Sequence, residues 1–331
     1  MMLKIAYLAM TMSSYERAEE ILKEMLNVKI GDDTIRNIVN FIGKIVYEND
    51  CNQTCQNINY YNTIANSPNK KCGVLYLETD GNFINIRNNN NKGSNWKENK
   101  IGVSFTSDDI IRWKNVNGEI CQKIGKREYI SHFCSADEFR SHLFALAIRN
   151  GYGCYETTIL ISDGAEWIKN FRKEYIPDAI HILDFFHLLD NASKFIKYIN
   201  ESANVFSDIT LNKWKELFIN SQYREVLEEI DKYKGMQCRD GVVNLYRYIT
   251  NNIESIDYKT YIKNEYYIGS GCVESANKSV IQKRLKQSGM RWKRQNAQYV
   301  ATLRAKIESN LWKSEVEKIV KKYFVNSKTV S

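Results

Sequence analysis

The chain has 331 residues, which is long enough for one large domain or two modest domains that each bury a core. Hydrophobic residues make up 43% of it and charged residues 26%, a balance typical of a soluble globular protein. No stretch approaches the ~18 uninterrupted apolar residues of a membrane span, and the eight scattered cysteines are typical of reduced thiols in an intracellular protein. The net charge is +8, so a cluster of basic residues would favour a polyanionic partner.

The N-terminal region, residues 1–70, predicts two helices joined by a tight turn and followed by a linker. Residues 13–26 place apolar side chains at helical spacing after a capping Ser14, and a second helix runs through residues 34–49. The pair suggests a helix-turn-helix with Thr34, Arg36 and Asn37 at the front of its second helix. A plain helical hairpin is the alternative. Residues 51–70 are polar and rich in Asn, as a linker would be.

The next region, residues 71–190, predicts the first part of a mixed sheet. Residues 73–87 are typical of a strand, a sharp turn at Asp80-Gly81 and a second strand, and a third strand is expected at 100–106. A helix at 136–150 follows, and then strands at 157–162 and 179–185. Hairpins followed by strands that alternate with helices indicate a mixed α/β sheet.

The remainder of the chain completes this organisation. Residues 191–266 carry apolar side chains at helical spacing without a strand signal, so we expect an all-helical insertion. Residues 267–331 return to the core with a late helix that follows Gly269 and Gly271 and ends near Gly289.

Three carboxylates are the candidate catalytic and metal-binding residues: Asp80, Asp163 and Glu274. Asp80 and Asp163 each end a predicted strand and precede a glycine, Gly81 or Gly164, and Glu274 lies near the start of the late helix. Acids held close together repel each other unless a cation lies between them, and Mg²⁺ prefers oxygen ligands. Two Mg²⁺ or Mn²⁺ ions at such a site support in-line phosphoryl transfer. A single Asp-Gly pair is also what an ordinary turn contains.

A basic stretch follows Glu274. Residues 278–306 contain nine Lys and Arg residues and no Asp or Glu. A solvated basic face is the ordinary explanation, and contacts to a phosphate backbone are the functional one. Trp292 stacks on an unpaired base or packs in the core. The candidate DNA-binding residues are Lys278, Lys283, Arg284, Lys286, Arg291, Trp292, Lys293, Arg294, Arg304 and, in the N-terminal region, Arg36.

Further residues are expected to support the site. Asp184 and His187 follow the last predicted strand, where Asp184 could hold the tautomer of His187, or His187 could cap the sheet. Gly269 and Gly271 permit a close approach of the backbone. The predicted supporting set is Gly81, Gly164, Trp167, Asp184, His187, Gly269 and Gly271.

Five motifs in order give the chain a family resemblance. The segments "ETDGNF", "WKENKIGVSF", "ISDGAEWI", "ILDFFHL" and "GSGCVESANKSVIQKRLKQSGMRW" resemble those of bacterial insertion-sequence transposases of the DDE type, with most similarity to the Kra and Lre groups. The resemblance covers residues 72–312. It implies a ribonuclease-H-like core interrupted by a helical insertion. It also implies that Asp80, Asp163 and Glu274 form the metal-binding triad and that Asp184-x-x-His187 lies near it.

The resemblance also implies an activity and partners. A DDE transposase cleaves and transfers DNA strands at the element ends, so it needs double-stranded DNA and acts as a homo-oligomer on it. We expect a cytoplasmic, nucleoid-associated bacterial protein. Members of this group usually carry a longer N-terminal DNA-binding region than this sequence shows. The difference bears on recognition of the element ends more than on catalysis.

Two rival functions are compatible with the same residues. A shortened relic would bind DNA without transposing, and excision of a marked element in cells separates it from an active enzyme. A host nuclease or resolvase on the same fold would cut structured DNA without needing element ends.

Overall fold

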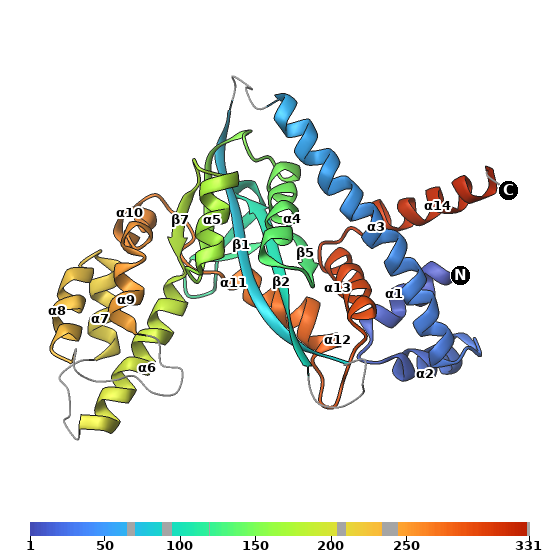
Figure 1. Cartoon of the computed structure of the whole chain (residues 1–331), viewed down its shortest axis with the longest axis horizontal. Coiled ribbons are helices and arrows are strands. Elements are labelled where there is room, and N and C mark those ends of the chain that lie inside the picture. The colour runs from blue at the N-terminus through green and yellow to red at the C-terminus, as the bar shows by residue number, and fades with distance from the viewer. Residues whose placement is uncertain (65–69, 88–94, 119, 204–209, 234–243, 330–331) are drawn as a thin grey trace. The chain divides into compact units, whose positions relative to one another are not determined.

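The protein is described by a computed structural model that covers residues 1–64, 70–87, 95–118, 120–203, 210–233 and 244–329 (Figure 1). The chain divides into two compact units. The first contains Met1–Thr158 and Cys272–Ser331, and the second contains Ile159–Gly271. Within the described ranges, no helix is both long enough and apolar enough to cross a membrane.

Five strands form a mixed sheet in the order β5-β2-β1-β6-β7. β1 pairs antiparallel with β2, as β2 does with β5, whereas β6 and β7 pair parallel. β6 begins in the first unit and ends in the second. The prediction of a mixed α/β sheet is therefore confirmed. The strands are β1 (Lys71–Ile86), β2 (Asn95–Thr106), β5 (Glu128–His132), β6 (Tyr155–Ser162) and β7 (Ile180–Leu183).

The predicted turn at Asp80-Gly81 is wrong, because β1 runs through both residues without a break. Its register with β2 is continuous, and Asp80 lies opposite Ile101 and Gly81 opposite Lys100. Asp80 therefore lies within a 16-residue strand and not at its tip. A local Asp-Gly signal favours a turn, but twelve cross-strand residue pairs hold the backbone extended here. Residues 88–94 lie outside the described residues, and β2 begins at Asn95, five residues before the predicted start of the third strand.

Two helices of the first unit were predicted correctly, and each begins at a side-chain cap. α2 (Tyr15–Leu26) starts after Ser14, whose side chain accepts a hydrogen bond from the Arg17 backbone nitrogen. α4 (Ala136–Arg149) starts with a capping box between Ser135 and Glu138. The sequence prediction missed α1 (Met2–Thr11), which buries Ile5, Ala6, Ala9 and Met10.

α3 (Asp32–Ile64) is a 33-residue helix that extends through most of the predicted linker. The expectation of a linker at 51–70 is therefore wrong as far as Ile64. Tertiary contacts override the polar composition: the Thr54 hydroxyl lies 3.0 Å from His142 Nδ1 on α4, and the Tyr61 and Phe144 rings meet at 5.3 Å. α3 also packs against α13 (Arg294–Glu308). A Cβ at Gly43 would lie 2.6 Å from the Tyr299 Cβ, so glycine permits this close contact.

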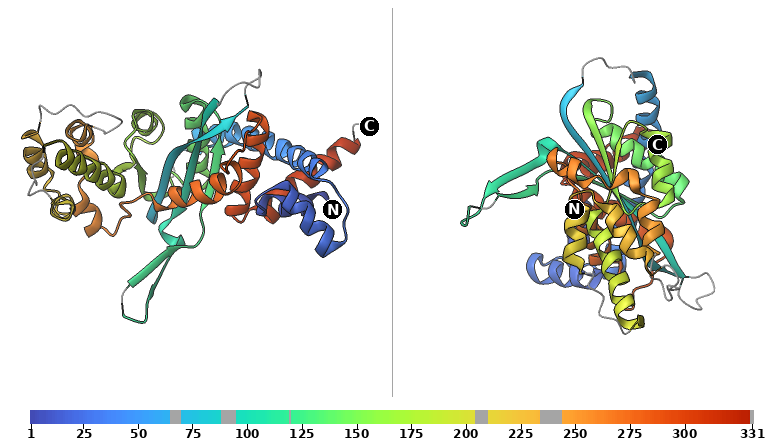
Figure 2. Two further views of the ribbon diagram at one scale, coloured as in Figure 1. Left: turned by 90° about the horizontal axis from the view of Figure 1, so that it is seen from below. Right: turned by 90° about the vertical axis from the view of Figure 1, so that its left-hand side faces the viewer.

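Between β2 and β5 the structure contains a hairpin that the sequence analysis did not predict. After a short 3₁₀ turn (Ser107–Asp109), β3 (Ile110–Lys114) pairs antiparallel with β4 (Ile120–Ile124) as a separate two-stranded sheet. Figure 2 shows this hairpin projecting from the five-stranded sheet. β5 was missed as well, because a five-residue strand gives little periodicity.

The second unit is largely helical. β7 is followed by α6 (Phe185–Ala203), α7 (Leu211–Ile219), α8 (Tyr223–Asp231), α9 (Leu245–Thr250) and α10 (Tyr258–Lys263). α5 (Glu166–Tyr175) lies between β6 and β7 in the sequence. The described residues between 191 and 266 contain no strand. Trp214 is completely buried, and its Nε1 donates a hydrogen bond to Glu229 at 2.5 Å, which ties α7 to α8. The predicted domain boundaries stay predictions.

His181 on β7 is a buried histidine held between two serines. Its Nε2 lies 2.8 Å from the Ser162 hydroxyl, and its Nδ1 lies 2.8 Å from the Ser255 hydroxyl. Burial, with smaller effects from Arg172 and Lys169, lowers the pKa of His181 from 6.5 to about 4. The imidazole is therefore neutral in the folded protein at neutral pH.

The shifted pKa of His181 predicts a loss of stability in acid. Below about pH 6.5 the unfolded chain binds a proton at this site and the folded chain does not, so stability falls as the pH is lowered from 6.5 toward 4. The full contribution is about 3 kcal/mol. Urea unfolding across this pH range should show a steeper loss for the wild type than for His181→Asn. Equal slopes for the two proteins would contradict the assignment.

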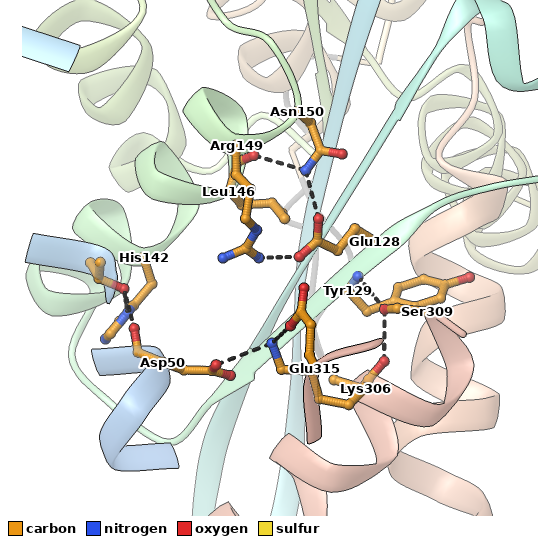
Figure 3. A network of polar contacts seen from close by, with 12 residues as sticks. Asp50, Glu128, Tyr129, His142, Leu146, Arg149, Asn150, Lys306, Ser309 and Glu315 are labelled. Carbon is orange, nitrogen blue, oxygen red and sulfur yellow. Dashed lines mark hydrogen bonds and ion pairs between the residues drawn. The ribbon is translucent and has the colours of Figure 1, made fainter. Parts of the chain in front are cut away.

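A buried ionic network joins α3, α13 and the segment before α14 (Glu317–Thr329) (Figure 3). Lys306 is 3% exposed, and its Nζ lies 3.1 Å from Asp50 and 2.7 Å from Glu315. Burial alone lowers the pKa of Lys306, but Asp50 and Glu315 outweigh it and raise that pKa above its ordinary value. Nearby, Arg149 and Asn150 both contact the Glu128 carboxylate. Lys306 belonged to the basic stretch of the sequence, yet its charge is compensated inside the fold.

Candidate active site

Alternate residues of β1 present a polar face to one helical segment of the first unit. Glu78, Asp80 and Asn82 lie on the same face because side chains alternate along a strand. The facing segment contains α11 (Gly271–Ala276), a turn of π-type hydrogen bonding (Asn277–Gln282) and α12 (Lys283–Leu285). We call this contact between strand and helix the polar seam.

Each of the three β1 residues has a partner along the seam. Val273 N donates to Glu78 Oε2 at 2.8 Å, and Asn277 Nδ2 donates to Asp80 Oδ2 at 2.6 Å. Further along, Lys286 Nζ donates to Asn82 Oδ1 at 3.0 Å. The Glu78 carboxylate is 1% exposed and binds a backbone amide in the first turn of α11, where a negative charge is favourable. The seam thus fixes the helical segment against β1 over its whole length.

Glu274 lies one helical turn before Asn277, and residues three apart lie on the same side of a helix. Asn277, which reaches the Asp80 carboxylate, is therefore a neighbour of Glu274 on the surface of the helix. Unlike Glu78, Glu274 is exposed. The π-type turn begins directly after this part of the helix, and such turns often occur at functional sites.

Two carboxylates, those of Glu78 and Asp80, lie in the seam. Burial, followed by the charge of Glu78, raises the pKa of Cys272 to about 12. Asp80 Oδ1 accepts a hydrogen bond from Gly81 N at 2.7 Å, so both of its carboxylate oxygens have a donor. Oxygen donors of this kind suit Mg²⁺. The donor chemistry therefore fits the predicted metal, although the described part of the chain gathers no group of three His, Cys, Asp or Glu side chains that could hold an ion.

Asp163 belongs to the second unit and directly follows β6. Its Oδ1 accepts a hydrogen bond from Ala165 N at 3.0 Å, and its backbone carbonyl accepts one from the Tyr248 hydroxyl at 2.7 Å. Gly164 has a φ of +83°, and a Cβ there would lie 2.6 Å from Asn252. A glycine is therefore required after Asp163. This backbone requirement explains the Asp-Gly pair at this position. Trp167 is half-buried on α5.

Asp184 caps α6 and does not hold the His187 ring. Its Oδ1 accepts backbone hydrogen bonds from Phe186 at 2.8 Å and His187 at 3.3 Å, and the Ser270 hydroxyl donates to Oδ2. The His187 side chain is exposed, so it does not cap the sheet either. A Cβ at Gly269 would lie 2.5 Å from the Phe186 ring, in agreement with the expected close approach, whereas the space around Gly271 is open.

The basic stretch separates into an exposed set and a buried set. Arg294 Nη2 donates to the Phe133 carbonyl at 2.6 Å and lines a pocket of about 430 Å³ together with Tyr47 and His142. Arg36, at the front of α3, is exposed and pairs with Asp33. The exposed members of the stretch are Lys278, Lys283, Lys286, Arg291, Lys293 and Arg294.

Arg284 and Arg304 are buried, contrary to the prediction that they contact DNA. Arg304 is 2% exposed, and its guanidinium group donates to the Met10 and Ser279 carbonyls and pairs with Glu308. Arg284 is 1% exposed and lies over the Tyr15 ring at 4.3 Å. Both charges hold the helices of the first unit together.

Trp292 is half-buried, and its ring contacts residues of its own unit. Its Nε1 donates to the Leu285 carbonyl at 3.1 Å, and Arg284 lies 5.5 Å from its ring. The Trp292 backbone forms a parallel bridge with Ile86 at the end of β1. This tryptophan therefore joins the basic stretch to the sheet.

Sequence reasoning missed Glu78, Asn82 and Asn277. The signal was present in "YLETDGN", where Glu78, Asp80 and Asn82 alternate with apolar or small residues in an otherwise apolar strand. Such alternation predicts one polar face that needs a partner, and the turn assigned to Asp80-Gly81 concealed it.

A second pocket in the structure lies in the second unit, and one of its lining residues, Asn252, neighbours Gly164 of the predicted supporting set. It has a volume of about 560 Å³, and His181, Lys169, Arg172 and Lys173 line it. None of its lining residues belongs to the predicted site.

These features define a mixed α/β protein whose sheet carries an acidic strand face against a helix with a basic continuation. Residues 2–322 match the Uncharacterised protein family (UPF0236), and the chain belongs to that family. No match is found among curated proteins. Among solved structures, the chain is similar to the Drosophila P element transposase strand transfer complex, with 9% sequence identity and a TM-score of 0.43 over 93% of this chain and 92% of that chain.

Proposed function

We propose that the protein is a DDE-type transposase of a bacterial insertion sequence, similar to the Kra and Lre groups, with a ribonuclease-H-like core. The observation that carries the proposal is the polar seam, in which the Asp80 carboxylate is held by Asn277, one turn after Glu274. The five sequence motifs of the resemblance include all three acids of the proposed triad. The exposed basic residues that follow Glu274 supply contacts for a phosphate backbone.

The proposed reaction transfers a phosphodiester bond. Water attacks the phosphorus at the element end, the P–O3′ bond breaks, and the leaving oxygen becomes a free 3′-hydroxyl. That hydroxyl then attacks a phosphodiester of the target DNA and releases a second 3′-hydroxyl. Asp80, Asp163 and Glu274 are the proposed ligands of two Mg²⁺ or Mn²⁺ ions, which when bound supply activation of the attacking oxygen and charge stabilisation of the leaving oxygen.

The other residues of the seam act on the position of these carboxylates. Asn277 fixes one oxygen of Asp80, and Glu78 fixes the start of the helix that carries Glu274. Gly164 permits the backbone turn after Asp163. Asp80 and Glu274 lie on regular elements, where ligand positions are better defined than on loops, and Asp163 directly follows one.

Double-stranded DNA is the proposed partner, both as element ends and as target. Lys278, Lys283, Lys286, Arg291, Lys293 and Arg294 form the proposed phosphate-contact set. Arg36, with Thr34 and Asn37 on α3, is the proposed contact of the N-terminal helices, and these three side chains are exposed. The proposal includes a homo-oligomer on DNA and a cytoplasmic, nucleoid-associated location.

A cleavage assay tests the proposal. Purified protein is incubated with labelled DNA that carries the flanking element ends, with Mg²⁺, with Mn²⁺ or with EDTA. We expect cleavage at the ends with either metal and none with EDTA, because the triad carboxylates act through bound cations. A duplex of equal length with scrambled ends is the control.

Two results would contradict the proposal and point to a rival. Binding of the ends without cleavage under every metal condition would indicate a DNA-binding relic. Equal cleavage of the scrambled duplex, or of branched DNA without element ends, would indicate a nuclease or resolvase.

A further inference from the structure

The β3–β4 hairpin is an arm that lacks cover by the rest of the described chain. It extends from the 3₁₀ turn after β2 and returns to β5, and its two strands form a sheet of their own. Both views in Figure 2 show it projecting from the first unit. Gly125 N donates to the Asp109 carbonyl at 2.8 Å, so the two ends of the arm lie side by side.

The arm exposes large apolar side chains. Ile111 is 48% exposed, Trp113 is 45% exposed, and Val116 near the tip is fully exposed. A two-stranded hairpin by itself is at most marginally stable in water, and exposed apolar clusters on a protein surface mark interaction sites. These side chains therefore call for a partner that has some apolar surface.

The charge of the arm is mainly basic: Glu119 is the one acidic residue in its sequence, and its described residues are 110–118 and 120–127. Arg112, Lys114, Lys123 and Lys126 are exposed, and no Asp or Glu occurs in these ranges. Ile111 lies opposite Lys123 in the register, and Trp113 follows on the same face, where Lys123 Nζ lies 6.0 Å from its ring. One face of the arm thus combines a tryptophan with a cation, and its partner must be a polyanion with apolar or aromatic groups.

We propose that the β3–β4 arm is a ribbon that binds double-stranded DNA. Two paired strands lie about 4.8 Å apart, and a two-stranded ribbon enters the major groove of B-form DNA, which is about 12 Å wide. Arg112, Lys114 and Lys123 then contact phosphates, while Trp113 and Val116 contact base edges or sugars. Duplex RNA fits poorly because its major groove is deep and narrow. The inference rests on the proposed function only in taking DNA as the polyanion.

Two altered proteins test the arm. In the first, residues 110–124 are replaced by a short Gly-Ser link, which the adjacent positions of Asp109 and Gly125 permit. In the second, Arg112, Lys114 and Lys123 are all changed to Gln. The matched control changes three exposed lysines outside the arm and outside the proposed contact set to Gln: Lys313, Lys318 and Lys321. Urea unfolding and circular dichroism establish that each protein is folded.

Affinity for duplex DNA is measured by fluorescence anisotropy over a range of salt concentrations. Each lost phosphate contact flattens the plot of log Kd against log salt by about 0.9, so the triple Gln variant should lose about 2 to 3 from the slope. Its affinity near physiological salt should fall by about tenfold to a hundredfold. The control keeps the slope of the wild type, and Trp113→Ala weakens binding without a change in slope, because it removes no charge.

Several results would overturn the inference, and they differ from failure of the proposed function. If the protein without the arm binds DNA with the same affinity and the same salt slope as the intact protein, the arm does not contact DNA. The transposase proposal would still stand. If removal of the arm changes the oligomeric state of the protein but not its DNA affinity, the arm forms a protein–protein contact instead. Equal affinity for duplex RNA refutes groove recognition. If the intact protein binds no DNA at all, both proposals fail together.

Discussion

Glu274→Gln is expected to abolish metal-dependent cleavage of the element ends while DNA affinity and folding stay close to those of the wild type. The amide keeps the size of the side chain but removes the negative charge that a divalent cation requires. A lost carboxylate ligand costs several kcal/mol of transition-state stabilisation, so we expect the cleavage rate to fall by at least about a thousandfold. Because Glu274 is exposed, the free energy of unfolding should change by less than about 0.5 kcal/mol.

Single-turnover cleavage of labelled ends, measured beside anisotropy on the same DNA, separates chemistry from binding. Asp80→Asn and Asp163→Asn should show the same loss of cleavage. Glu216→Gln on α7 is a matched control, since it makes the same change at an exposed helical glutamate outside the proposed site. Cleavage by Glu274→Gln within tenfold of the wild-type rate would remove this residue from the triad.

Lys306→Met is expected to lower the free energy of unfolding by about 3–5 kcal/mol, the cost of breaking a buried ion pair by removing one partner. The substitution keeps most of the aliphatic stem but leaves Asp50 and Glu315 without the cation that lies 3.1 Å and 2.7 Å from them. Burial already raises the pKa of Asp50, so the unpaired carboxylate will be still harder to ionise. Urea unfolding at neutral pH measures the change.

An exposed lysine provides the comparison for Lys306. Lys321 is 71% exposed at its side chain and lies 3.7 Å from Glu317, so Lys321→Met should cost no more than about 0.5 kcal/mol. Adding Asp50→Asn and Glu315→Gln to Lys306→Met should recover part of the lost stability, since the uncompensated charges are removed. A loss below about 1 kcal/mol for Lys306→Met alone would show that the network contributes little.

Helices with strong local signals could be predicted from the sequence. α2 and α4 begin within two residues of their predicted starts, α2 after the predicted Ser14 cap and α4 at Ala136. These signals act over three or four residues, so their effect is readable without the rest of the fold. The strands β6 and β7 were also found, because buried strands read as short apolar runs, whereas their parallel pairing was not predicted.

The predictions that failed depended on distant partners. The Asp80-Gly81 pair favours a turn locally, yet pairing with Ile101 and Lys100 on β2 keeps it in a strand. The polar residues after Cys51 favour a linker, yet contacts with α4 keep α3 helical to Ile64. In both cases tertiary contacts outweigh a local preference of about 1 kcal/mol or less per residue.

At the candidate site, too, some features follow from the sequence alone and others from tertiary contacts. The sequence by itself determined which acids, glycines and basic residues are present and in what order, and the five motifs follow from that order alone. Only the tertiary structure decided that Asn277 reaches Asp80, that Glu78 binds the start of α11, and that Arg284 and Arg304 are buried while the basic residues between them are exposed. The composition gives the number of charges but not their surroundings in the fold. Whether a charged side chain contacts solvent, a carboxylate or a backbone carbonyl depends on residues that are distant in the sequence. The hydrogen bond from Arg304 to the Met10 carbonyl, for example, joins residues 294 positions apart.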